Sequence, residues 1–289
     1  MNAVLKCYYV IGDFRLELIE LIKAMILGVI EGVTEWLPIS STGHMILTDE
    51  LLHLNVTEAF KEMFLVVIQL GAILAVVVLY FNKLNPLCRA KTRVERKDTL
   101  ALWAKVLIAC IPAAIIGFIF DDALNRLFYN YITVAVTLIL YGALFIALEK
   151  RNKTRTFAIT EMCSLSYRAA AMIGVFQLLA LIPGTSRSGA TILGAMIIGA
   201  SRVVATEFSF FLAIPVMLGA SALKLMKFGF VFSRPELMIL LTGMVIAFVV
   251  SIMAIKFLMG YIKKHGFKVF GYYRIALGLI VVIFFLVCG

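Results

Sequence analysis

The apolar and polar positions of this chain divide it into long hydrophobic stretches separated by short polar connections. Six stretches hold few charged residues and are each close to the length of helix that crosses a membrane, about 20 residues. The pattern therefore predicts six transmembrane helices. We expect them at about 62–81, 100–119, 131–148, 205–226, 236–259 and 269–288.

Two polar segments lie inside apolar sequence. The first island, residues 31–44, holds two carboxylates, three consecutive hydroxyl residues, a proline and a histidine. The second island, residues 183–191, holds a proline, two glycines, four hydroxyl residues and an arginine. Ionisable groups at membrane depth are costly and usually serve a function. Both islands are therefore candidate parts of a site.

Each island also interrupts a helix. The apolar segment at about 21–37 stops at Pro38, because proline has no N–H to donate and disfavours helix at the residue before it. A second apolar arm, starting near Ile173, stops at Pro183 in the same way. Irregular backbone at membrane depth is tolerated only where it lines a buried cavity. We expect short helices to resume beyond the breaks, near His44 and at about 190–200.

The two halves of the chain share one order of elements: a broken helix pair and then three spans. Repeat 1 covers about 21–150 and repeat 2 about 165–289, within a single integral-membrane domain of residues 1–289. Ser41-Thr42-Gly43 aligns with Arg187-Ser188-Gly189. An odd number of full crossings turns the second repeat upside down, so inverted repeats would bring the two breaks together near the midplane. The predicted fold class is an all-α polytopic membrane protein with two inverted repeats.

Composition agrees with this class. Hydrophobic residues make up 63% of the 289 residues, charged residues 15%, and the mean hydropathy is +1.03, values typical of a polytopic membrane protein. The net charge of +10 fits basic cytoplasmic loops better than nucleic-acid binding. Basic loops at about 83–97, 150–155 and 263–268 and an acidic loop at Asp121 and Asp122 place the C-terminus outside. Five isolated cysteines indicate neither a zinc site nor a disulfide framework.

Two carboxylates dominate the first island. Glu31 and Glu35 are four residues apart and share one helix face. Paired carboxylates at depth repel each other unless a proton or a cation lies between them, and Mg²⁺ or Ca²⁺ sites that are completed by substrate phosphates are built in this way. The alternative is a protonated pair, or a pair bonded to neighbouring helices.

The hydroxyl run that follows favours an anion. Ser40, Ser41 and Thr42 offer hydroxyls, and the turn at Gly43 can present backbone N–H groups to phosphate. His44 is three residues after Ser41, within reach as its general acid or base. The alternatives are helix capping by the serines and a histidine that is simply bonded in the core.

Arg187 is the informative residue of the second island. A guanidinium at membrane depth suits bidentate phosphate binding. The alternative interpretation of Arg187 is an ion pair with Glu31 or Glu35. We assign substrate binding to its neighbours as well: Ser186, Ser188, Gly189 and Thr191, the last as a hydroxyl contact or a helix start. Three further charged residues, Arg202, Glu207 and Arg274, are expected in structural pairs near the membrane ends.

The two islands resemble a known family. Glu-Gly-x-Thr-Glu-x-Leu-Pro-x-Ser-Ser-Thr-Gly-His and Pro-Gly-x-Ser-Arg-Ser-Gly-Ala-Thr are similar to the signature motifs of bacterial undecaprenyl-pyrophosphate phosphatases of the bacitracin-resistance type. Trp36 stands where that family often carries Phe. The resemblance implies a multi-pass enzyme of the bacterial plasma membrane that removes the terminal phosphate of undecaprenyl pyrophosphate and recycles the lipid carrier for peptidoglycan synthesis.

The resemblance also implies roles for individual residues. Glu31 and Glu35 would serve metal or proton chemistry with Mg²⁺ or Ca²⁺, Ser41 would be nucleophile or phosphate ligand, His44 its acid/base partner, and Arg187 the pyrophosphate clamp. A lipid or anion transporter, or flippase, is the alternative, because inverted repeats with broken helices are typical of transporters. The sequence leaves open the metal, attack by serine or by water, the side of entry, and whether a homodimer forms.

Overall fold

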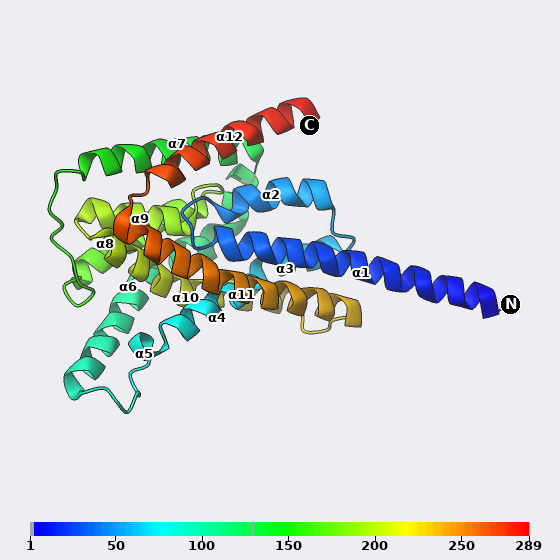
Figure 1. The fold of residues 1–289 in the computed structure, drawn as a ribbon, viewed down its shortest axis with the longest axis horizontal. Coiled ribbons are helices and arrows are strands. Elements are labelled where there is room, and N and C mark those ends of the chain that lie inside the picture. The colour runs from blue at the N-terminus through cyan, green and yellow to red at the C-terminus, as the bar shows by residue number, and fades with distance from the viewer. Residues whose placement is uncertain (1–2, 129, 289) are drawn as a thin grey trace.

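The computed structural model describes the backbone of residues 3–128 and 130–288, and side chains within residues 17–287 apart from those at 121, 122, 125 and 129. The described chain is helical, with no β-strand, and most helices run roughly along one common direction (Figure 1). This confirms the all-α prediction.

All six predicted spans form helices that are long and apolar enough to cross a membrane. The first is made of two consecutive helices, which together cover Glu58–Leu79. The chain is therefore a multi-pass membrane protein. The spans are α3 (Glu58–Val67) with α4 (Gln69–Leu79), α6 (Arg93–Phe128), α7 (Tyr131–Arg151), α10 (Arg202–Phe228), α11 (Arg234–Lys264) and α12 (Lys268–Cys288), with the short α5 (Phe81–Leu84) after α4.

The acidic loop expected at Asp121 and Asp122 is wrong, because α6 continues to Phe128. No glycine or proline follows Gly117 before the end of α6, so nothing in the backbone stops the helix at the acidic pair. The two side chains themselves lie outside the described residues.

Both islands break a helix as predicted. The first break separates α1 (Ala3–Thr34) from α2 (Ser41–Leu52), and the second separates α8 (Tyr167–Gln177) and the 3₁₀ turn η1 (Leu178–Leu181) from α9 (Arg187–Ile198). The α1–α2 pair lies to the right of the centre in Figure 1 and the α8–α9 pair lies to the left. The start of α1 extends beyond the rest of the molecule.

The returning helices begin three residues earlier than expected, at Ser41 rather than near His44 and at Arg187 rather than 190. The physical reason is a pair of matching caps. Ser40, at φ 73°, accepts a hydrogen bond from Gly43 N at 3.3 Å. Ser186, at φ 70°, accepts one from Gly189 N at 3.2 Å. Each serine satisfies a first-turn N–H group of its helix.

The left-handed conformation is uncommon for a residue with a side chain, yet it occurs at the same point of both breaks. This shared geometry supports the predicted repeat, while the inversion of one repeat relative to the other stays a prediction.

Close glycine contacts position the helices that flank the breaks. A Cβ atom on Gly28 of α1 would lie 2.6 Å from the carbonyl oxygen of Gly243 in α11. A Cβ on Gly142 of α7 would lie 2.6 Å from the carbonyl of Gly271 in α12. Real Cβ atoms do not approach backbone so closely, so glycine allows both helix pairs to pack backbone to backbone. The second contact brings α12 and its Arg274 against the breaks.

Candidate active site

The two islands meet through Glu35. Its Oε1 accepts a hydrogen bond from Arg187 Nη2 at 3.0 Å, and its Oε2 accepts one from Ser41 Oγ at 3.0 Å. Glu35 lies in the turn just after α1, Ser41 begins α2 and Arg187 begins α9. One carboxylate therefore connects the first residues of both returning helices.

Arg187 is fixed by more than this ion pair. Its Nη1 donates to Ser209 O at 2.7 Å, and its guanidinium carbon lies 6.0 Å from the centre of the Trp36 ring. Its Nε has no partner among the described residues. The ion pair considered as the alternative is present, and phosphate binding by Arg187 stays a prediction.

Glu31 is buried one turn before Glu35, with only 1% of its surface exposed. It lies within electrostatic range of both Glu35 and Arg187. Its Oε1 has no hydrogen-bond partner among the described residues. Burial of a carboxylate oxygen is costly without a partner, so this oxygen is an unused ligand position.

His44 is held by two partners, neither of which is Ser41. Its Nδ1 lies 2.7 Å from Ser40 O, and its Nε2 lies 2.7 Å from Tyr273 Oη. A carbonyl oxygen only accepts, so Nδ1 must carry the hydrogen. The predicted pairing of Ser41 with His44 does not appear in these hydrogen bonds, in which Ser41 bonds to Glu35 instead.

The hydroxyls of the second island mostly bind protein atoms. Ser188 Oγ is within hydrogen-bond distance of Ser186 Oγ at 3.0 Å, Glu35 O at 3.2 Å and Leu37 O at 3.4 Å. Ser188 therefore ties α9 to the turn after α1. Ser186 serves mainly as the cap of α9.

Thr191 lies one turn into α9. Its hydroxyl is 2.8 Å from Arg187 O and 2.7 Å from Ser209 Oγ, so it braces α9 against α10. Thr42, by contrast, is half-buried in the first turn of α2, and Gly43 supplies the capped N–H. A Cβ on Gly189 would lie 3.2 Å from Arg274 Nη1, so glycine there makes room for a guanidinium.

Arg274 is the central residue that the sequence interpretation missed. It is fully buried, and it donates from Nη1 to Pro38 O at 3.3 Å and from Nη2 to Gly184 O at 2.8 Å and Thr185 O at 3.0 Å. Arg274 thus holds both breaks. No carboxylate pairs with it among the described residues. A lone arginine deep in apolar sequence was the available signal.

The pairing expected for Arg274 near a membrane end is wrong, because its partners are carbonyls of the interrupted backbone. The other two residues of that prediction do form ion pairs. Arg202 binds Glu149 at 2.6 Å, and Lys83 binds Glu207 at 2.6 Å.

Buried polar atoms without a partner gather at the breaks. Of nine such side-chain atoms among the described residues, seven belong to the broken segments or to Arg274, which binds both. Native proteins rarely leave such groups unpaired, and exceptions often mark functional sites. The seven atoms are Glu31 Oε1, Trp36 Nε1, both Gln177 amide atoms, Thr185 Oγ1, Arg187 Nε and Arg274 Nε.

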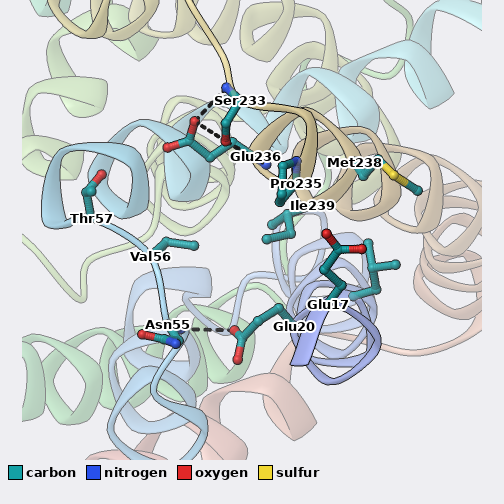
Figure 2. A pocket seen from close by; sticks show the side chains of 11 residues that line it. Glu17, Glu20, Asn55, Val56, Thr57, Ser233, Pro235, Glu236, Met238 and Ile239 are labelled. Carbon is teal, nitrogen blue, oxygen red and sulfur yellow. Dashed lines mark hydrogen bonds between the residues drawn. The ribbon is translucent and has the colours of Figure 1, made fainter. Parts of the chain in front are cut away.

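A cavity of about 510 Å³ lies elsewhere, between α1, the α2–α3 connection and the start of α11 (Figure 2). Its acidic groups are already engaged in part. Glu20 accepts from Asn55 N at 2.9 Å, and Glu236 accepts from Ser233 Oγ at 2.7 Å. No residue of either island lines it, so it is separate from the candidate site.

Comparison with known proteins shows the family of this chain. Residues 24–280 match the family described as bacitracin resistance protein BacA. This chain belongs to that family. An undecaprenyl-diphosphatase of Acetivibrio thermocellus is 66% identical over 93% of this chain and 99% of its own length.

Other members are nearly as similar. An undecaprenyl-diphosphatase of Enterococcus faecalis is 60% identical over 93% of this chain and 98% of its own length. An undecaprenyl-diphosphatase of Streptococcus mutans is 54% identical over 92% of this chain and 96% of its own length. Both islands and both breaks lie within the matched residues. Helix α1, which leads into the first break, begins before the matched segment.

Proposed function

We propose that this protein is an undecaprenyl-diphosphatase of the bacterial plasma membrane. It hydrolyses the terminal phosphate of undecaprenyl pyrophosphate and gives undecaprenyl phosphate and inorganic phosphate, which recycles the lipid carrier for peptidoglycan synthesis. The observation that carries this proposal is the junction at Glu35, where Ser41 and Arg187 bind the same carboxylate. Relatives with 54–66% identity bear that enzyme name.

The breaks are suited to a pyrophosphate. The N-termini of α2 and α9 carry first-turn N–H groups and the positive ends of their helix dipoles. Arg187 contributes a guanidinium whose Nε is unpaired, and Arg274 adds a second positive charge without a carboxylate partner. In a site of low dielectric constant such groups stabilise the charge of a phosphoryl transition state. Arg187 therefore binds phosphate oxygens, in exchange for part of its contact with Glu35.

Ser41 touches the terminal phosphate. Its hydroxyl proton is directed at Glu35 Oε2, 3.0 Å away, so Glu35 accepts that proton if the serine oxygen attacks. If water attacks, Ser41 acts as a phosphate ligand and Glu35 takes the proton of the water. In both cases undecaprenyl phosphate is the leaving group. After attack by the serine, water hydrolyses the phosphoserine, which releases inorganic phosphate and restores the Ser41 hydroxyl. His44 supplies a second proton site on the same helix.

A divalent cation, Mg²⁺ or Ca²⁺, fits one part of this arrangement. Glu31 Oε1 is free to bind it, whereas both oxygens of Glu35 are already bonded to other side chains. The described residues contain no cluster of three or more His, Cys, Asp or Glu side chains that could hold a metal. Such a cation would therefore depend on substrate phosphates for further ligands, as Mg²⁺ commonly does. When bound, it would neutralise phosphate charge.

The membrane location suits the substrate. The isoprenoid chain lies in the bilayer while the headgroup reaches the two breaks. From the basic loops and the positive-inside rule we infer that the C-terminus lies outside. The lipid is the partner on which the proposal rests, and a homodimer is compatible with it but not required.

Phosphate release from undecaprenyl pyrophosphate by detergent-purified protein tests the proposal. The assay is run with chelator, then with Mg²⁺ or Ca²⁺ restored, and beside Ser41→Ala and Glu35→Gln. We expect metal-restored release that both variants lose. Each variant is first checked for a monodisperse profile and an unchanged thermal midpoint, so that loss of folding is recognised.

Absence of release by well-folded protein across metals and isoprenoid pyrophosphates would contradict the enzyme. A lipid or anion transporter would then be the better interpretation of the paired breaks, and flux into proteoliposomes would be measured. Release that is unaffected by chelator, with both variants inactive, would retain the phosphatase and remove the cation.

A further inference from the structure

Tyr273 contacts the first break through His44. It lies on α12 next to Arg274, and 45% of its surface is exposed. Its hydroxyl is 2.7 Å from His44 Nε2, and the two ring planes are nearly parallel, 8° apart with centroids separated by 5.6 Å. The histidine is thus held between α12 and its own helix.

The hydrogen bonds define which ring nitrogen carries the hydrogen. Ser40 O accepts from Nδ1, so the neutral ring has its lone pair at Nε2. Tyr273 must then donate its hydroxyl hydrogen to Nε2. The oxygen of the Tyr273 hydroxyl keeps its lone pairs and can still accept a hydrogen bond from a further partner.

We propose that Tyr273 is a positioning residue of this phosphatase, which holds the His44 ring in place and connects Nε2 to the exposed side of the site. A hydroxyl suits both protonation states of the ring. It donates to Nε2 when the ring is neutral and accepts from Nε2–H when the ring is charged. In the second state its own hydrogen turns to water or to a phosphate oxygen, so no proton is created or lost.

A purely structural role explains the geometry less well. Tyr273 is half-exposed and stands beside Tyr272, which is 61% exposed and makes no hydrogen bond recorded among the described residues. A role in packing alone would leave the hydroxyl of Tyr273 without a partner among the described residues, as it leaves the hydroxyl of Tyr272. What distinguishes Tyr273 is its contact with the one histidine of the island.

The inference rests on the proposed phosphatase activity, and its test uses the purified full-length protein with undecaprenyl pyrophosphate. Tyr273→Phe keeps the ring and removes the hydroxyl. We expect kcat to fall about three- to tenfold, the effect of one hydrogen bond, with KM changed less than about twofold and a displaced pH profile of kcat. Tyr272→Phe is the matched control and should retain the rate and the pH profile of the starting protein.

A double-mutant cycle separates positioning from structure. If Tyr273 acts through His44, Tyr273→Phe in a His44→Gln background should cause no further loss. Equal losses in both backgrounds, or an unchanged kcat and pH profile in Tyr273→Phe, would overturn the inference while leaving the phosphatase intact. Failure of the starting protein to release phosphate would instead remove the proposed function itself. A thermal midpoint within error of the control variant shows that each protein is folded.

Discussion

The two breaks share one backbone design but carry different chemistry. Each begins its returning helix with a serine in the left-handed region whose hydroxyl caps the N–H three residues on. At the next position the first break has Ser41 and the second has Arg187. Four residues after the cap the first has His44 and the second has Ala190. The groups assigned to proton chemistry therefore lie in the first break. The second break has the positively charged Arg187 and hydroxyl residues that bind protein atoms.

This difference indicates how a repeated scaffold becomes asymmetric. The caps place two helix N-termini at one point, and the residue after each cap decides what that terminus presents. The side chains of Ser41 and Arg187 both donate hydrogen bonds to the Glu35 carboxylate. In the proposed mechanism, one repeat would contribute the groups that move protons, and the other would contribute positive charge.

The largest expected effect comes from Glu35→Gln, which removes the acceptor of Ser41 and the counterion of Arg187 together. Phosphate release should fall by about 100-fold or more, the range of a lost general base. The measurement is kcat with saturating lipid. Glu62→Gln is the control, because Glu62 is an exposed partner of Lys224, and it should keep normal turnover. Comparable losses in both variants would argue against a special role for the junction.

A smaller but broader effect is expected for Arg274→Ala, since Pro38, Gly184 and Thr185 lose their shared donor. Thermal unfolding should show destabilisation of at least about 1.5–3 kcal/mol, the range for one hydrogen bond to a charged group, because three such bonds are lost. Turnover should also fall. Arg274→Lys keeps the charge but not the fork of donors. A lysine variant as active as the unchanged protein would mean that charge alone matters there.

The matching caps provide the most direct comparison of the breaks. Ser40→Ala and Ser186→Ala should each cost about 1 kcal/mol of stability, because each removes one cap. Glycine should cost less at both sites, since it adopts positive φ without strain. Thermal midpoints of the four variants test this, and a cost at only one break would show that the caps are not equivalent. Turnover should fall more for the two variants at position 40, because loss of the cap loosens the turn whose backbone carbonyl binds His44.

The smallest effect is expected for Thr191→Val. Loss of its bond to Ser209 should cost about 0.5–1.5 kcal/mol, visible as a lower thermal midpoint, with KM essentially unchanged. A rise in KM of tenfold or more without loss of stability would restore Thr191 to the substrate site. Thr42→Val, in the corresponding turn of the first break, is the comparison variant.

Much of this architecture follows from the sequence, because long apolar segments and prolines act locally. Six spans and both breaks could be placed, and the ion pair of Arg187 with Glu35 was one of two stated alternatives. The starts of α2 and α9 could not, since a serine at positive φ gives no signal in composition. The end of α6 differs from the expectation, because nothing in the backbone interrupts the helix at the acidic residues.

The residues from α12 were missed for a different reason. Arg274 and Tyr273 lie more than 80 residues from either island in sequence, and only tertiary packing of α12 against α7 brings them to the breaks. A lone arginine in apolar sequence indicates function without indicating its partner. The roles of the site residues and the cation stay predictions that the experiments above can test.

The Glu35–Arg187 ion pair also bears on how a product leaves. The Glu35 carboxylate binds the same guanidinium that the proposed mechanism assigns to phosphate, so in that mechanism the two compete. An arriving headgroup must compete with it, which weakens binding of every phosphate, including the one released. Because the carboxylate is tethered beside the guanidinium, it returns as soon as phosphate moves away and discourages rebinding. With Arg187 in the proposed phosphate-binding role, the pair would act as an internal competitor that keeps the product from blocking the site.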